Sequence, residues 1–251
     1  MWIDDQVLRQ CDQPIAIATW VPQSPMVVLG SSNDPAREVE QTYCADARIP
    51  VLRRYGGGGT VVLYDGCVVI SVGTWVKEHF QNAKYFRALN ACVIAVLAKR
   101  WPKLSECVTS GISDIAISDH KIAGTSLFRS RNYLLYQASI LIDLNVDLVT
   151  QCLKHPSKEP DYRRGRSHSE FLIGLRDLAS DASPQDVVEL MSRNLNGIMR
   201  DVLGDELVSP ASEQFAGLLA RAGTVTSIDH CRCHPTTGES SGRAERCPKQ
   251  T

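Results

Sequence analysis

Short apolar segments, in which β-branched residues alternate with polar ones or run together, dominate the first part of the chain and predict strands. These segments cover residues 15–21, 26–30, 51–54, 60–64 and 67–73. Asp65-Gly66 separates the last two of them and predicts a tight hairpin turn. Asp34 and Pro35 are typical of an N-cap and a first helical residue, so we expect a helix over residues 34–47.

The rest of the chain predicts one further hairpin, one more strand and several helices. Apolar residues at helical spacing predict an amphipathic helix from Asn82 to Trp101 that packs on the sheet. Segments 113–118 and 120–126 predict a hairpin, and 133–144 is long enough for a central strand, the last of the sheet. We expect helices over 146–153, 184–203 and 210–221, with a basic loop at 154–170.

These elements together predict an α/β (α+β) domain in which a mixed β-sheet is flanked by helices. We assign this domain to residues 1–222. Residues 223–251 are polar and rich in Gly, Ser and Thr, which predicts a mobile tail. The tail contains the segment HCRCH at 230–234, whose one-residue cysteine spacing does not match a zinc site, so its role stays unassigned.

The composition of the chain limits which classes of partner and which cellular compartment we expect. The formal net charge is −1 and the pI about 6.6, so no overall basic field favours nucleic acid as a partner. We expect no secretory signal, because the N-terminus lacks a basic segment followed by an apolar one. We expect no membrane span, because the sequence has no run of about eighteen apolar residues. The nine cysteines lack CxxC spacing, which favours free thiols in a reducing cytoplasm.

The segment RRYGGGGT, residues 53–60, joins two of the predicted strands. It has neither the GK[ST] ending of a P-loop nor the G-x-G-x-x-G spacing of a dinucleotide site. Glycines can turn successive N–H groups toward an anion, and Arg53 and Arg54 could add donors to a phosphate or carboxylate. The alternative is a glycine-rich hairpin bulge whose arginines are solvated.

Lys121 lies on the second predicted hairpin, shortly before Gly124. A lysine at this place could reach the glycine loop, where its ammonium would stabilise charge on an α-phosphate and a departing pyrophosphate. Asp114, at the start of the same hairpin, could hold Mg²⁺ or orient the lysine. An isolated lysine is more often a solvated surface residue, so the combination carries the hypothesis.

The segments VVLGSSNDPAREV, LRRYGGGGTVVL and SDIAISDHKIAGTS occur in an order and spacing that resemble the lipoate-protein ligase family. The resemblance covers residues 3–178, and the family belongs to a superfamily with biotin-protein ligases and octanoyltransferases. It implies a class II synthetase-like catalytic domain in which Lys121 is the essential lysine. ATP and lipoyl-AMP are then expected at Arg53, Arg54, Tyr55, Gly56, Gly57, Gly58, Gly59, Thr60, Val61, Asp114, Lys121, Ile122, Gly124, Thr125 and Gln137.

The resemblance implies that lipoate or octanoate is activated with ATP and Mg²⁺ and then transferred to a lysine of a lipoyl-domain acceptor. The family's C-terminal accessory domain does not fit in this chain, so a separate accessory chain is a possible partner. A GRGR-type loop of biotin ligases is absent, which favours lipoate. Three positions depart from the family pattern: Leu63 and Gln137 replace histidines, and Ser113 replaces an asparagine.

Two other functions stay open. An octanoyltransferase would need a cysteine nucleophile, for which Cys152 is the candidate if Lys154 and His155 lower its pKa; the alternative is a small buried hydrophobic residue. A non-catalytic subunit could instead bind a lipoyl group without chemistry. The basic loop is likewise open: it could close over the nucleotide, meet an acidic acceptor, or be solvated. Its candidate residues are Arg163, Arg164, Arg166 and His168, next to Tyr162.

Overall fold

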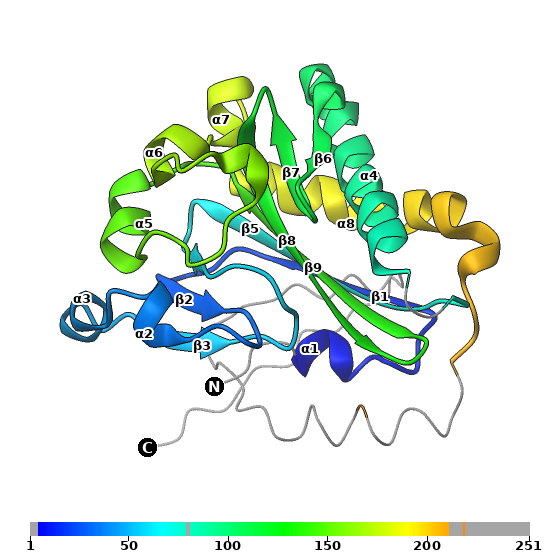
Figure 1. Cartoon of the computed structure of the whole chain (residues 1–251). Helices are drawn as coiled ribbons and strands as arrows, with labels where there is room; N and C mark the ends of the chain where they lie inside the picture. The colour runs from blue at the N-terminus through cyan, green and yellow to red at the C-terminus, as the bar shows by residue number, and fades with distance from the viewer. Residues whose placement is uncertain (1–4, 79–80, 211–217, 219–251) are drawn as a thin grey trace, which may run out of the picture.

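The computed structural model describes residues 5–78, 81–210 and 218, and its largest element is a six-stranded sheet (Figure 1). The strand order is β1-β5-β9-β8-β7-β6, and each neighbouring pair is antiparallel. β5 and β9 lie in the middle and are apolar along almost their whole length. The strands are β1 (Ile15–Trp20), β5 (Cys67–Trp75), β6 (Val108–Ser110), β7 (Asp114–Ile117), β8 (His120–Ser130) and β9 (Tyr133–Leu141).

A second, three-stranded sheet lies beside the first, at the lower left of Figure 1, and has the order β3-β2-β4. β2 (Met26–Leu29) is parallel to β3 (Val51–Arg53) and antiparallel to β4 (Val61–Leu63). Mixed pairing is thus confined to this small sheet. One of its faces packs on helices α3 and α5, and the other meets Val69 of β5.

Two long helices, α4 (Asn82–Arg100) and α8 (Pro184–Leu203), cover one face of the large sheet. On α8 the buried residues recur every four positions, from Val187 through Met191 and Leu195 to Met199. Alternate residues of β5 and β9 contact α4 and α8. The residues between them point to the opposite face of the sheet. Both helices were expected, the first of them from the periodicity of its apolar residues.

The helix expected over residues 34–47 is two helices, α2 (Pro35–Glu38) and α3 (Gln41–Asp46). The predicted start is confirmed, since the Asp34 side chain accepts from the Ala36 N–H and Pro35 is the first helical residue. The single-helix prediction is wrong because Val39 is extended and bridges Leu153 of another segment. A tertiary contact here outweighs local helix propensity.

The hairpin predicted at Asp65-Gly66 is also wrong. β4 belongs to the small sheet and β5 to the large one, so the chain crosses between sheets at this turn. The Gly66 carbonyl accepts from the N–H groups of Ile142 and Asp143, just beyond β9. A Cβ at Gly66 would lie 2.4 Å from the Asp143 carbonyl oxygen, so glycine is required by close approach rather than by a hairpin.

The other hairpin and the last strand are confirmed. Ser118 and Asp119 join β7 to β8 with positive φ values of 46° and 65°, typical of a tight hairpin. The three-residue strand β6 was missed. The remaining elements are α1 (Asp5–Leu8), η1 (Pro102–Glu106), α5 (Val146–Cys152), η2 (Asp161–Arg163), α6 (His168–Phe171), α7 (Leu175–Leu178) and η3 (Gly204–Glu206).

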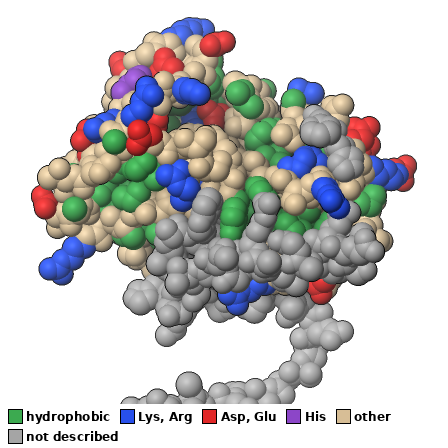
Figure 2. Space-filling model, turned by 60° about the horizontal axis from the view of Figure 1, so that its bottom comes forward, with side chains coloured by type: hydrophobic (Ala, Val, Ile, Leu, Met, Phe, Trp, Pro, Cys, Tyr) green, Lys and Arg blue, Asp and Glu red, His purple; other side chains and the backbone are tan. Residues whose placement is uncertain are grey.

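Three predictions fall outside the described residues. The helix over 210–221 is described at residues 210 and 218 alone, and the boundary at 222 and the tail from 223 are not described. Within the described residues, no helix has the length and apolarity needed to cross a membrane. On the side shown in Figure 2, basic and acidic side chains of described residues are interspersed, in keeping with the net charge of −1.

Candidate functional site

The glycine loop joins β3 to β4 and is organised from within by Arg54. One guanidinium nitrogen of Arg54 donates to the carbonyls of Gly57 and Gly59, each at 2.8 Å, and another to Val28 at 3.4 Å. The arginine is only 6% exposed. Charge-assisted bonds of this kind fix both a loop and the side chain that makes them. The solvated-arginine interpretation is therefore wrong for Arg54.

Arg53 points to a different loop. Its Nη1 donates to the carbonyls of Gly30, Ser31 and Asn33 at 2.8–3.0 Å. These residues connect β2 to α2, so Arg53 holds that connection against the glycine loop. The hairpin-bulge interpretation is wrong as well, because β3 and β4 lie on opposite sides of β2.

The glycines allow close packing more than a continuous anion nest. Of the four, all of which are described, Gly58 alone has a positive φ, of 94°. A Cβ at Gly56 would lie 2.8 Å from the Ser126 Oγ on β8, and a Cβ at Gly30 would lie 2.2 Å from the Gly58 carbonyl oxygen. The loop is thus fitted between the β2 terminus and the large sheet.

The hairpin β7–β8 places the predicted lysine and aspartate together. Lys121 Nζ lies 2.8 Å from Asp114 Oδ1, and the two side chains are 21% and 13% exposed. A Cβ at Gly124 would lie 3.1 Å from Lys121 Nζ, so the glycine leaves room for the lysine side chain to fold across the strand. An ammonium held in this way is a compact, partly desolvated positive charge.

A pocket lies between the two sheets and receives the glycine loop and the β7–β8 hairpin. Its apolar wall comes from the small sheet and β5, where Val28, Leu63 and Val69 pack together. Its polar wall comes from the glycine loop, β7, β8 and β9. The lining residues are Val28, Arg54, Gly59, Thr60, Val61, Leu63, Val69, Ser113, Asp114, Lys121, Gly124, Thr125, Ser126, Gln137, Ala138 and Ser139.

Nine of the residues predicted from the sequence are part of this lining: Arg54, Gly59, Thr60, Val61, Asp114, Lys121, Gly124, Thr125 and Gln137. The other expected binding residues lie outside it. Tyr55 stacks on Phe128 with ring centroids 5.5 Å apart, and Ile122 is fully buried in the core under α4. Gly56, Gly57 and Gly58 shape the loop without lining the pocket.

Sequence reasoning missed several lining residues that strand alternation could have found. A period of two along β8 leads from Gly124 to Ser126, and along β9 it leads from Gln137 to Ser139. It also missed Asn90 of α4, which is fully buried and donates to the Ser113 carbonyl at 3.0 Å. Asn90 thereby fixes the residue that precedes Asp114.

Cys152 does not have the environment that a nucleophile requires. Its side chain is buried at the end of α5, and burial raises the pKa of its thiol to about 12, with Cys44 adding to the effect. The expected lowering by its neighbours is wrong, since Lys154 donates to the Ala36 carbonyl and His155 pairs with Glu159. The interpretation of Cys152 as a small buried hydrophobic residue fits this geometry.

The basic loop is folded over Phe171 rather than fully solvated. Arg163 is 5% exposed, and its guanidinium lies 4.8 Å from the Phe171 ring centroid, while that of Arg166 lies 5.3 Å from it. Arg164 stays exposed. Burial, with the positive charges of Arg163, His155 and Lys121 nearby, lowers the pKa of His168 to about 4. His168 is therefore neutral beside the lysine at neutral pH.

A resident metal centre is not built into the described part of the chain, where no three His, Cys, Asp or Glu side chains gather. The prediction of Mg²⁺ at Asp114 concerns an ion that arrives with ATP. Lys121 and Tyr162 each engage one oxygen of the Asp114 carboxylate, which has about four acceptor positions. One carboxylate together with substrate phosphates is a usual Mg²⁺ ligand set, so the donor chemistry fits.

Comparison with known proteins gives relatives of similar sequence. Residues 1–196 match the model of the lipoyl protein ligase A/B catalytic domain. Lipoate–protein ligase 2 of Staphylococcus aureus is 24% identical over 191 residues, covering 74% of this chain and 53% of that protein. The inactive lipoate–protein ligase 2 of Plasmodium falciparum is 21% identical, covering 69% and 54%. The chain thus spans about half the length of these curated relatives.

Solved structures share the fold. A lipoate-protein ligase A bound with ATP matches with a TM-score of 0.63 at 20% identity, covering 87% of this chain and 85% of that one. The bi-partite lipoate protein ligase of Thermoplasma acidophilum matches with 0.63 at 19% identity, covering 88% and 89%. The resemblance seen in the glycine loop and the Lys121 hairpin is confirmed, and the chain belongs to the lipoyl protein ligase A/B catalytic domain family.

Proposed function

We propose that this chain activates lipoate or octanoate with ATP and transfers the acyl group to a lysine of a lipoyl-domain acceptor. One observation carries the proposal. Segments of the chain more than sixty residues apart bring Lys121 and the end of the glycine loop to the same pocket, opposite an apolar wall. A cationic, hydrogen-bonding region beside an apolar one suits an acyl chain that ends in a reactive carboxyl group.

The first step forms a mixed anhydride. A carboxylate oxygen of the acid attacks the α-phosphorus of ATP, a new O–P bond forms, and the bond to pyrophosphate breaks. Lys121 neutralises the charge that develops on the α-phosphate and leaving group, and the loop that Arg54 holds orients the phosphate. Mg²⁺ held by Asp114 and the phosphates would supply further charge neutralisation.

The second step forms the amide. The neutral amine of an acceptor lysine attacks the carbonyl carbon, the bond from that carbon to AMP breaks, and the amine nitrogen loses a proton. AMP is a far better leaving group than oxide, which is why activation comes first. The solved relatives bound with ATP and with lipoic acid support this pair of substrates for a chain of the same fold.

Partners and compartment follow from the same proposal. The Thermoplasma ligase is bi-partite, so we propose that a separate accessory chain is a partner of this chain. The acceptor is a lipoyl domain. The six described cysteines are free, which suits the cytoplasm. The octanoyltransferase alternative is not favoured, because Cys152 is buried with a raised pKa.

The test is ATP–pyrophosphate exchange with lipoate, octanoate and biotin compared, with and without a candidate accessory chain. We expect exchange with lipoate or octanoate and none with biotin. Lys121→Ala should lower the exchange rate by about 10²–10⁴-fold with little change in acyl-chain affinity, and Lys121→Arg should not restore it. Lys84→Ala is the matched control, since Lys84 pairs with Glu78 and Glu206 outside the pocket.

Each contrary result points to a different alternative. Exchange with biotin alone would overturn the substrate assignment. Unchanged exchange in Lys121→Ala would overturn the role of the lysine. No exchange in the wild type, even with an accessory chain and acceptor present, would favour the non-catalytic subunit, a state for which the inactive Plasmodium relative is a precedent.

A further inference from the structure

We infer that Tyr162 is a positioning residue for Lys121 and acts through Asp114. The Tyr162 hydroxyl donates to Asp114 Oδ2 at 2.9 Å, while Asp114 Oδ1 lies 2.8 Å from Lys121 Nζ. The carboxylate is therefore held at both oxygens, by the lysine on one side and the tyrosine on the other. The inference rests on the proposed function only in assigning chemistry to Lys121.

Tyr162 itself is closely packed. Its ring lies 5.1 Å from that of Phe171, and its carbonyl accepts from Arg166 at 2.8 Å. On the other side is the β6–β7 turn, where Gly111 has a φ of 58° and a Cβ would lie 2.9 Å from Pro160 and 3.5 Å from the Tyr162 ring. Because the ring is confined between these groups, the hydroxyl has a fixed place from which to donate.

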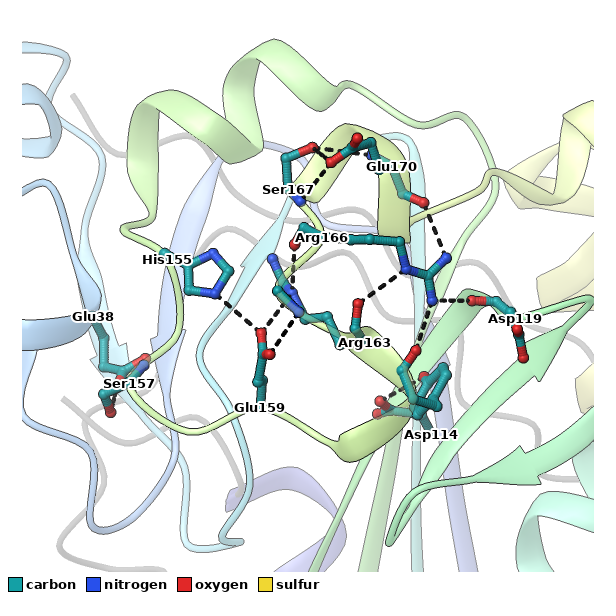
Figure 3. A network of polar contacts seen from close by, with 12 residues as sticks. Glu38, Asp114, Asp119, His155, Ser157, Glu159, Arg163, Arg166, Ser167 and Glu170 are labelled. Carbon is teal, nitrogen blue, oxygen red and sulfur yellow. Dashed lines mark hydrogen bonds and ion pairs between the residues drawn. The ribbon is translucent and has the colours of Figure 1, made fainter.

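The segment that carries Tyr162 is attached to the same hairpin as Lys121 (Figure 3). Arg166 donates to the Asp119 carbonyl in the β7–β8 turn at 2.9 Å. The Ile173 N–H, just beyond α6, donates to the carbonyl of Lys121 at 3.1 Å. Lys121 is thus held through its own backbone by Ile173 and through its side chain by Asp114 and Tyr162.

Glu159 keeps the segment folded from its other end. Its carboxylate accepts from the Gly165 N–H at 2.8 Å and lies 3.5 Å from the Arg163 Nε. His155 pairs with the same carboxylate at 3.0 Å. The network therefore runs from His155 through Glu159 to the arginines and ends at Asp114 and Asp119, as Figure 3 shows. This network reaches the reactive ammonium indirectly, because the Tyr162 hydroxyl donates to Asp114 and Asp114 pairs with Lys121.

The physical consequence concerns orientation and not charge. Without the phenolic hydroxyl, the Asp114 carboxylate keeps its charge but loses one of its two fixed contacts and can rotate. The ammonium then follows the carboxylate away from the place where the transferring phosphate needs it. A misplacement of about 1 Å in a catalytic group can lower a rate by about 10²-fold.

The experiment compares Tyr162→Phe with Tyr43→Phe. The Tyr43 hydroxyl also makes a hydrogen bond, to Gln151 at 2.6 Å, but outside the pocket. We expect Tyr162→Phe to lower the kcat of pyrophosphate exchange by about 10–100-fold with the KM for the acyl acid unchanged within about twofold. In an Asp114→Asn background, Tyr162→Phe should cause no further loss, because the two act in series. Tyr43→Phe should match the wild type.

A second measurement does not need activity. Reductive methylation of the protein, followed by mass spectrometry, reports how readily each lysine reacts. We expect the rate at Lys121 to rise severalfold in Tyr162→Phe and to stay constant in Tyr43→Phe. If the wild type shows no exchange, the proposed function fails while this measurement still tests the link between Tyr162 and Lys121.

Three outcomes would overturn the inference. The first is that Tyr162→Phe changes neither the exchange rate nor the methylation of Lys121. The second is that Tyr162→Phe causes an equal loss of exchange with and without the Asp114 carboxylate. The third is an effect confined to the KM for ATP, which would place Tyr162 in direct contact with the nucleotide. Tyr162→Phe keeps the ring that packs on Phe171. If it fails to fold, methylation of Lys121 in Asp114→Asn decides: an unchanged rate rejects the link.

Discussion

Gly30 is the position at which one added methyl group should most directly disturb the glycine loop. It directly follows β2 and begins the connection to α2, and its carbonyl accepts from Arg53. A Cβ built on Gly30 would lie 2.2 Å from the Gly58 carbonyl oxygen and 3.0 Å from the Asn33 Oδ1. The first contact is with backbone, which cannot rotate away as a side chain can. Gly30→Ala must therefore displace the loop itself.

The size of the displacement follows from the distances. Carbon and oxygen atoms come no closer than about 3.3 Å in ordinary contacts, so the loop must move by about 1 Å. Overpacking of this kind costs about 1–3 kcal/mol of unfolding free energy. For a domain of this size, that cost lowers Tm by about 2–12 °C. A 1 Å shift of Gly59 and Thr60, which line the pocket, should lower adenylate formation by about 10²-fold.

Gly57→Ala is the matched control, since a Cβ there meets nothing within 4 Å. The measurements are thermal unfolding and pyrophosphate exchange on wild type, Gly30→Ala and Gly57→Ala. We expect Gly57→Ala to stay within about 1 kcal/mol of the wild type and to keep its exchange rate. If Gly30→Ala matches Gly57→Ala in both measurements, the close approach of the two loops is not a constraint and the reasoning is refuted.

Three further predictions test buried polar groups. The thiol of Cys152, with its pKa near 12, should resist iodoacetamide in the native protein at about pH 8 and react after unfolding, as peptide mass spectrometry would show. The pKa of His168 in the folded protein is about 4, below its ordinary 6.5, so between these values the unfolded chain binds one more proton than the folded chain. The free energy of unfolding should therefore fall by at most about 3 kcal/mol as pH drops from 6.5 toward 4. Urea unfolding should show this pH dependence in the wild type and a weaker one in His168→Gln. Asn90→Ala should cost about 2–4 kcal/mol in the same assay, because it leaves the Tyr136 hydroxyl without its acceptor and leaves the Ser113 carbonyl with Thr125 as its remaining donor; a change below about 0.5 kcal/mol would contradict this.

The strands and long helices could be predicted because their periodicity is local. Pairing could not. Asp65-Gly66 has the residues of a hairpin turn, yet β4 and β5 join different sheets. A warning was present in the sequence, since the nearly continuous apolar run at residues 67–73 is typical of a strand buried on both faces, and β5 is buried at every position. The break at Val39 had no Gly or Pro to mark it and depends on a contact with Leu153, more than a hundred residues away.

Part of the pocket lining could be predicted, at positions where residue type alone indicates chemistry. Arg54, Asp114 and Lys121 line the pocket as expected. Arg53 was misjudged, because adjacent residues on a strand point to opposite sides and only one of two neighbouring arginines can face a given pocket. The role of Tyr162 could not be predicted, since its bond to Asp114 depends on how residues 155–171 fold back across the β7–β8 hairpin.

Because the pocket is lined by both sheets, a molecule bound in it would contact both of them. Val28 and Leu63 belong to the small sheet and Val69 to the large one, and all three pack in one cluster at the pocket wall. In the proposed reaction, an acyl chain against this wall touches both sheets at once and adds apolar contact between them. Occupancy and cohesion are then linked: free ligand at about a hundred times its Kd stabilises the folded chain by about 2.7 kcal/mol. In that reaction a bound acyl group would extend the apolar core between the two sheets, and its release after transfer would remove this contact.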